Sequence, residues 1–502
     1  MTFAALRALQ AIIAAGIDDI ERVFASESAS GARSADGSPS TDFPALDVPG
    51  DPDSRAEALM SHPEVLSAVA RIVSAADHLA ATVRAPFLTL CNAGMGYHLT
   101  GCLRFLEAAH IPELLSNAGP DGMLAGDIAR RVGVDASTTG HILRLLATHH
   151  LLREVRPDCF ALNRISALLD SGKTFEALSQ RKEWKYDGRG QKAAFFAVNS
   201  DELFKAGAYL TDMLLPHAVT DDAALPPAAF NLSQRTATPY WAWLEAPGNE
   251  ARLARFGCAM GGSQGWEEVA LQALGDHPFP ELPDGAVVVD VGGGIGATTV
   301  RLAERFARLK FIVQDRAPVC RLGEEALRAR NPEMLSSGRS VRAPAVFLVR
   351  TVCHDWPDDF ARRILLQLRR AAGPMTRLVI GEHILPYAVA GARDGATEHA
   401  PALADIAGAR DVQLLRGARW PLLANLGTAS ANVYWMDLTM KTIFNGKERT
   451  LPEHVALAAS AGWRVVRVSG IEGSLFGHIV ALPGPLPADV AAQSGAELRA
   501  RL

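Results

Sequence analysis

The second half of the chain alternates short apolar runs with amphipathic stretches, which predicts strands and helices in alternation. The apolar runs predict strands at 286–290, 310–314, 346–350, 377–382, 463–469 and 474–482. The amphipathic stretches predict helices from about 296, from about 318 and over 358–372. This order predicts an α/β fold with a mainly parallel sheet, whose ligands lie at the carboxyl ends of its strands. The last two runs are close enough to form an antiparallel hairpin.

The first half is helical and rich in alanine from about residue 58. The stretch "MLAGDIARRVGVDASTTGHILRLLATHHLLREVRPDCFALN", residues 123–163, predicts two helices, the second capped by Asp135, and then a hairpin that turns at Arg156-Pro157-Asp158. This is the outline of a winged helix-turn-helix. A DNA-binding domain needs several basic residues, but residues 111–170 hold six Arg or Lys against seven Asp or Glu. A packing or dimerisation module is therefore the favoured interpretation, and DNA binding the alternative.

Composition and patterning divide the 502 residues into four parts. Residues 1–57 predict an amphipathic helix and then a disordered linker, because Ser26 to Arg55 is rich in Ser, Gly, Pro and Asp. Residues 58–230 form the predicted helical domain, residues 231–484 the α/β domain and residues 485–502 a tail. The net charge of −5 and the lack of 18 consecutive apolar residues argue against nucleic acid and membrane as partners. Six scattered cysteines predict reduced, buried thiols and a cytoplasmic protein.

A glycine-rich turn in "GAVVVDVGGGIGATTVRLAERF" joins the first predicted strand of the sheet to a helix. Gly292, Gly294 and Ala297 match G-x-G-x-x-A, and Asp315 ends the next strand, where an acid can accept both hydroxyls of a ribose. NAD and S-adenosylmethionine both satisfy this pattern. Asp290, directly before the glycines, would repel a pyrophosphate but tolerates a cationic sulfonium. The antiparallel hairpin at the end of the chain is also the usual finish of a methyltransferase sheet, so S-adenosylmethionine is favoured.

Three further motifs follow in order. "VFLVRTVCHDWPDD" places His354 just past a strand, "LVIGEHILP" ends the next strand at Glu382, and "NGKERT" places Glu448 before a helix. With these motifs, residues 60–483 resemble the S-adenosylmethionine-dependent O-methyltransferases that act on phenolic natural products. The family includes plant caffeate and flavonoid enzymes and fungal enzymes of the sterigmatocystin type. The resemblance implies a class I, Rossmann-like methyltransferase sheet behind an N-terminal, mostly α-helical winged-helix dimerisation domain.

The same resemblance implies roles for individual residues. His354 is the expected general base that takes the proton of a phenol, and Glu382 and Glu448 flank its ring as the other expected catalytic residues. The expected S-adenosyl-L-methionine contacts are Asp290, Gly292, Gly293, Gly294, Asp315 and Arg350. Met260 and Met440 match methionines that sandwich an aromatic substrate, with core packing as the alternative. The resemblance implies a homodimer and no metal.

The chain departs from the family pattern in one region. After the helix that starts near residue 318, which we expect to stop near Ser337, about eight residues remain before the strand at Val346, and none is Asp or Glu. A strand with its turn needs more room. We therefore expect an edge strand and the acid that holds the adenine to be absent. The segment 388–420 is longer than in plant members.

Two alternatives remain at this point. The first is a homologue that binds the cofactor but is catalytically impaired, including a winged-helix regulator without turnover. The second is an NAD(P)-dependent oxidoreductase, which should carry a Tyr-x-x-x-Lys motif after the fourth strand; the sequence has none there.

Overall fold

The computed structural model describes residues 2–29, 42–215, 227–263, 274, 278–330, 343–389, 403–409, 418–470 and 474–488. The chain divides into two compact units, Met1–Trp266 and Glu267–Leu502. This division falls later than residue 231, where the sequence analysis began the α/β domain. The reason is that α15 (Glu250–Gly262) packs on α10 (Gln191–Val198) within the first unit, through a buried cluster that contains Ala194 and Ala259.

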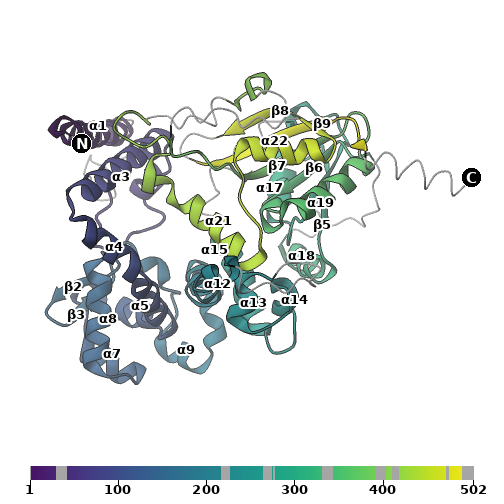
Figure 1. Ribbon diagram of the computed structural model, residues 1–502. Helices are drawn as coiled ribbons and strands as arrows, with labels where there is room; N and C mark the ends of the chain where they lie inside the picture. Colours follow the sequence, from purple (N-terminus) through teal and green to yellow (C-terminus); the bar gives the residue numbers. More distant parts are fainter. Residues whose placement is uncertain are drawn as a thin grey trace, which may run out of the picture. The chain divides into compact units, whose positions relative to one another are not determined.

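The first unit is mainly helical (Figure 1). Besides α10 and α15, its helices are α1 (Phe3–Ala29), α2 (Arg55–Leu59), α3 (Pro63–Val83), α4 (Pro86–Met95), α5 (Tyr97–Ala108), α6 (Ile111–Ala118), α7 (Ala125–Val132), α8 (Ala136–Thr148), α9 (Phe175–Gln180), α11 (Phe204–Gly207), α12 (Leu210–Leu214), α13 (Ala229–Gln234) and α14 (Tyr240–Leu244). The predicted N-terminal helix is present. Residues 30–41 of the predicted linker lie outside the described residues. The prediction of disorder is wrong for much of the rest, because α1 continues to Ala29 and Leu46 accepts the backbone N–H of Arg164 at 3.0 Å.

Helix α1 packs against α3 instead of standing apart from the fold. Val23 and Phe24 of α1 are buried with Val65 and Ala68 of α3. In the described part of the chain, α3 is the helix whose length and apolar composition would allow it to cross a bilayer. One such helix is weak evidence of a membrane span, and 22% of its apolar stretch is buried within the protein.

The predicted order of helix, helix and hairpin is present in the first unit. Helices α7 and α8 are followed by a three-stranded sheet in the order β1-β3-β2, built from β1 (Met123–Leu124), β2 (Arg153–Arg156) and β3 (Cys159–Ala161). Asp135 caps α8, because its carboxylate accepts the backbone N–H of Thr138 at 2.7 Å. Arg144 of α8 is paired with Glu154 at 3.1 Å and with Asp158 at 2.6 Å. This cation is therefore already neutralised within the unit, which argues against a contact with DNA phosphates.

The second unit is built on a six-stranded sheet in the order β5-β4-β6-β7-β9-β8. The strands are β4 (Val287–Val291), β5 (Lys310–Gln314), β6 (Val346–Arg350), β7 (Arg377–His383), β8 (Trp463–Gly470) and β9 (Phe476–Pro483). The pairs β4–β5, β4–β6 and β6–β7 are parallel, whereas β7–β9 and β8–β9 are antiparallel. The structure thus confirms the mainly parallel sheet with an antiparallel end. The bounds of all six strands lie within two residues of the predicted bounds.

Helices cover both faces of this sheet (Figure 1). The covering helices are α17 (Ala297–Arg305), α19 (Asp358–Ala371) and α22 (Leu451–Ser460). The unit also contains α18 (Ala317–Arg330) and α21 (Ala431–Phe444). One apolar layer joins β4 and β6 to α19 and α22, for example through Val349, Leu365 and Val455. The other layer joins the same strands to α17 through Val288 and Leu302. This double cover explains why the parallel strands are apolar on both faces.

The edge of the sheet bears on the edge strand that we expect to be absent. Among the described residues, β5 is the edge of the sheet, which agrees with the expected loss of an edge strand. The expected helix stop near Ser337 and the segment up to 342 lie outside the described residues. Part of the long segment 388–420 is described: Ala407 accepts the backbone N–H of Val468 at 2.8 Å, so this segment returns to the β8 edge.

All six cysteines lie in described residues and are free thiols, as the sequence predicts. Their expected burial is only partly right. Cys159 and Cys353 are buried, whereas the other four are half-buried because they lie on helix faces near the surface.

Candidate active site

The glycine turn lies at the carboxyl end of β4, between its neighbours β5 and β6, where the connections of the sheet diverge. Gly292 and Gly294 adopt positive φ of 71° and 59°. A Cβ on Gly293 would lie 2.6 Å from Asp290 Cγ, and one on Gly292 would lie 2.6 Å from Val352 Cγ2. A Cβ on Gly294 would instead project into open space. The turn therefore needs its glycines and leaves room for a ligand to approach the backbone.

Two acids flank this turn. The backbone N–H of Gly294 donates to Asp315 Oδ2 at 2.8 Å, which draws the end of β5 to the glycines. Asp290 is buried and accepts the Thr299 hydroxyl at 2.6 Å, and burial raises the pKa of Asp290 to about 6. The Arg350 guanidinium lies 5.0 Å from the centre of the Phe476 ring. The structure thus gathers Asp290, the glycines and Asp315, as the sequence predicts.

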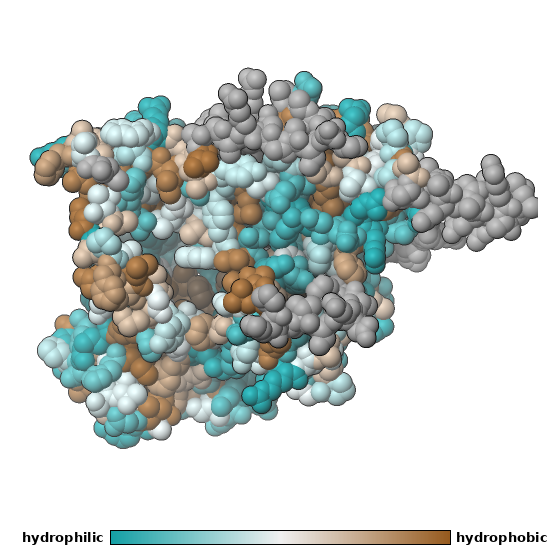
Figure 2. All heavy atoms as spheres, viewed as in Figure 1, coloured by the Kyte–Doolittle hydropathy of each residue, from teal (hydrophilic) through white to brown (hydrophobic). Residues whose placement is uncertain are grey.

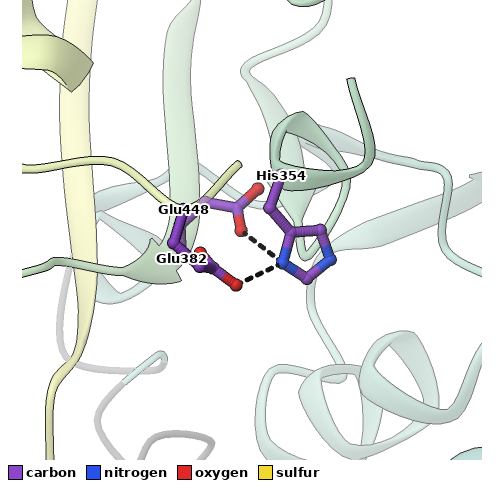
Figure 3. Close-up of side chains that lie close together, drawn as sticks. All are labelled: His354, Glu382 and Glu448. Carbon is purple, nitrogen blue, oxygen red and sulfur yellow. Dashed lines mark hydrogen bonds and ion pairs between the residues drawn. The ribbon is translucent and has the colours of Figure 1, made fainter. Parts of the chain in front are cut away.

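A second cluster lies past the next strands of the sheet. His354 follows β6 in a short 3-10 turn (Cys353–Asp355), Glu382 is the penultimate residue of β7, and Glu448 lies between α21 and α22. His354 Nδ1 lies 2.7 Å from Glu448 Oε1 and 3.5 Å from Glu382 Oε2. Both carboxylates converge on the same ring nitrogen, and the other nitrogen of the ring points away from them (Figure 3).

Hydrogen bonds fix the two carboxylates and the turn that carries the histidine. Glu382 Oε1 accepts the backbone N–H groups of Val352 at 3.1 Å and Cys353 at 2.8 Å, so Oε2 faces the ring. Arg449 is fully buried and donates to the backbone oxygens of Cys353 and Trp356, each at 2.9 Å. The residue next to Glu448 therefore holds the His354 turn in place.

Charge and burial set the protonation of this cluster. Burial favours the neutral imidazole, but the carboxylates of Glu448 and Glu382 outweigh it and raise the pKa of His354 well above 6.5. Burial would raise the pKa of Glu448, but the contact with His354 lowers it below its usual range. The pKa of Glu382 is raised, chiefly by burial. In the neutral ring, the two carboxylates favour the tautomer with its proton on Nδ1, toward Glu448, which leaves the lone pair on Nε2.

Several known proteins are similar to this chain in sequence. The family model described as O-methyltransferase domain matches residues 266–408. An O-methyltransferase of Armillaria gallica is 36% identical over 448 residues, which cover 86% of this chain and 92% of that protein. The chain belongs to the O-methyltransferase family. The 4-O-methyltransferase 1 of Phanerochaete chrysosporium is 34% identical to this methyltransferase over 443 residues, which cover 85% of this chain and 90% of the relative.

Solved structures support the same fold for this methyltransferase. The crystal structure of OxaC in complex with sinefungin and meleagrin has a TM-score of 0.59 and 22% identity, and covers 83% of this chain and 93% of that one. The family membership confirms an S-adenosylmethionine-dependent enzyme, and it excludes the oxidoreductase alternative.

The residues around the glycine turn fit S-adenosylmethionine. The open space over Gly294 admits a ligand against the backbone, and the Asp315 carboxylate beside it can accept ribose hydroxyls. Asp290 is too deeply buried to face the ligand freely; it holds Thr299 and so shapes the turn from beneath. Its direct contact with the cofactor stays a prediction.

Asp355 and His383 also lie at this cluster, although no motif in the sequence indicates chemistry for them. Asp355 Oδ1 lies 3.5 Å from His354 Nε2, and burial raises the pKa of Asp355 to about 7. His383 Nδ1 lies 3.6 Å from Glu448 Oε1. Each residue directly follows a predicted site residue in the sequence, which is the signal that could have found it.

The two methionines expected at the substrate lie in different units. Met440 is buried on α21 of the second unit, whereas Met260 lies on α15 of the first unit with 44% of its surface exposed. Core packing and a substrate contact explain the burial of Met440 equally well.

Proposed function

We propose that this methyltransferase transfers the methyl group of S-adenosylmethionine to a phenolic hydroxyl of an aromatic secondary metabolite, with His354 as the general base. One observation carries the proposal: Glu448 binds His354 Nδ1 at 2.7 Å, which leaves Nε2 as the nitrogen that accepts a proton. A phenol has a pKa near 10, so at neutral pH its oxygen needs a base to become a good nucleophile.

Each residue of the cluster has one task in this proposal. His354 Nε2 takes the phenolic proton as the oxygen attacks, and the ring becomes an imidazolium. Glu448 stabilises that cation through Nδ1, and Glu382 adds a second negative charge at 3.5 Å. Bound S-adenosylmethionine supplies the electrophilic methyl group. Glu382 and Glu448 are positioning residues because they contact the ring and not the substrate.

The test combines turnover with cofactor binding. The protein and a panel of phenols, each beside its methyl ether, are incubated with S-adenosylmethionine labelled in the methyl group. We expect label in products of the phenols alone. Asp315→Ala should weaken binding of S-adenosylhomocysteine in calorimetry about tenfold or more, which is ~1.4 kcal/mol, because the ribose hydroxyls lose their acceptor.

Asp284→Ala is the matched control, since the Asp284 side chain is 86% exposed in the same unit. We expect it to leave binding unchanged. Equal labelling of phenols and ethers, or full cofactor affinity in Asp315→Ala, would contradict the proposal.

We also propose that the chain forms a homodimer through α4. This helix exposes Phe87, Leu88 and Leu90, with 73%, 54% and 71% of their surfaces accessible. Figure 2 shows brown, hydrophobic side chains gathered over α4. Such a patch is typical of an interaction surface. Light scattering should give the mass of two chains for the native protein and of one chain for Leu90→Glu, and the mass of one chain for both would refute the dimer.

A further inference from the structure

The cluster of His354, Glu382, Glu448 and His383 contains buried polar atoms that have no hydrogen-bond partner among the described residues. Glu382 Oε2, Glu448 Oε2 and His383 Nδ1 are buried and make no hydrogen bond to any part of the chain that the structure describes. The Glu382 and Glu448 side chains are at most 1% exposed, and that of His383 is 11% exposed. Unsatisfied carboxylate oxygens in a buried site are costly unless a cation meets them.

The two cations beside Glu448 in the sequence do not meet this need. Lys447 pairs with Asp358 at 3.0 Å and with Glu453 at 3.1 Å. The Arg449 guanidinium donates hydrogen bonds to the backbone oxygens of Cys353 and Trp356 and forms an ion pair with the Asp358 carboxylate. Two buried carboxylates therefore lie beside His354 with one oxygen each that accepts no hydrogen bond from the described residues. A divalent cation would bind such oxygens.

The separations of the donor atoms match a metal ion. One ligand atom each from His354, Glu382 and Glu448 can be chosen so that all lie within 4.8 Å of one another. Zn²⁺ binds N and O ligands at about 2.0–2.2 Å in a tetrahedron, which sets the ligand atoms about 3.3 Å apart. His354 Nδ1 and Glu382 Oε2 are 3.5 Å apart, and His383 Nδ1 and Glu448 Oε1 are 3.6 Å apart. The hydrogen bond of 2.7 Å between His354 Nδ1 and Glu448 Oε1 is shorter than this spacing and would have to lengthen by about half an ångström.

We propose that His354, Glu382, Glu448 and His383 form a site for a divalent transition-metal ion such as Zn²⁺, and that an ion bound there switches the methyltransferase off. Two imidazoles with two carboxylates suit Zn²⁺, whereas Mg²⁺ prefers six oxygen ligands. The site stays reachable because the His354 side chain is 12% exposed.

The inhibition follows from the proton on the ring and rests on the proposed role of His354 as base. An ion on Nδ1 takes the lone pair of that nitrogen, so the Nδ1 proton moves through solvent to Nε2. Nε2 then carries a hydrogen and has no lone pair to accept the phenolic proton. The metal-bound ring is a donor where the reaction needs an acceptor.

Direct binding tests the site without any substrate. The protein, cleared of metal by a chelator, is titrated with Zn²⁺ in a calorimeter, beside Glu382→Gln, His383→Gln and the control Glu176→Gln, whose side chain is 66% exposed. We expect one Zn²⁺ per chain for the native protein and the control, with affinity at least tenfold lower in the two cluster variants. Equal affinity in all four proteins would overturn the site.

X-ray absorption of the native protein loaded with Zn²⁺ keeps the test decisive if a variant fails to fold. Backscattering from two imidazoles and oxygen ligands is expected, whereas sulfur ligands would place the ion on cysteines and overturn the proposal. In the methylation assay, Zn²⁺ should abolish turnover, excess chelator should restore it, and Mg²⁺ should have no effect. Full turnover with Zn²⁺ bound would overturn the switch and leave the proposed function standing. A chain that binds Zn²⁺ in the cluster but methylates no phenol would refute the proposed function and leave the metal site standing.

Discussion

Replacing His354 by glutamine is expected to lower kcat for phenol methylation about 10²- to 10⁴-fold, the usual contribution of a general base. Glutamine keeps polar atoms near Glu448 but cannot accept the phenolic proton. Binding of S-adenosylhomocysteine should stay unchanged, because the residues that hold it surround the glycine turn after β4. Initial rates with saturating substrates measure the loss. His141→Gln, at an exposed position of α8, is the matched control.

The acidity of the substrate separates loss of the base from general damage. A phenol that is already ionised at the assay pH does not need a base, so the loss caused by His354→Gln should shrink as the pKa of the phenol falls. A loss that is the same for acidic and ordinary phenols would show that His354 does not act as the base.

Local sequence predicts the strands of the second unit well, because their pattern is dense and regular. The run of valines in β4 and the apolar run of β6 are buried on both faces, so each begins and ends where polar residues or glycines appear. The boundary between the two units depends on tertiary packing instead. Helix α15 joins the first unit through contacts with α10, some 60 residues earlier in the chain, and the sequence of neither helix specifies this partner.

The sequence predicts the site only in part, for the same reason. His354 follows β6 and Glu382 lies near the end of the neighbouring parallel strand β7, so their proximity follows from the strand order. The position of Glu448 depends on a long-range pairing, in which Arg449 bridges Ile384 in parallel and accepts the N–H of Leu385 at 3.0 Å. This pairing brings Glu448 beside His383. No periodicity in the sequence indicates it, and the contribution of His383 was therefore missed.

The pH dependence of the reaction tests how Glu448 acts on His354. The base must be neutral, so kcat/KM should be low in acid and rise as the pH passes the pKa of His354, which the carboxylates hold above 6.5. The groups that face the ring are Glu448, Glu382 and Asp355, and a chelator in the buffer keeps metal ions out of the profile.

Glu448→Gln should change this profile in two ways that a merely structural residue would not cause together. Loss of the negative charge removes the main support of the imidazolium, so the rising limb should move toward acid by about one pH unit or more, which is ~1.4 kcal/mol. The plateau kcat should also fall about 10²-fold or more, since the ring loses the acceptor that orients it and stabilises its charge. Glu453→Gln, in which a half-exposed carboxylate of the next helix is removed, is the control and should keep both the limb and the plateau. A limb that stays in place while kcat falls would mean that Glu448 holds the loop but does not set the charge of His354.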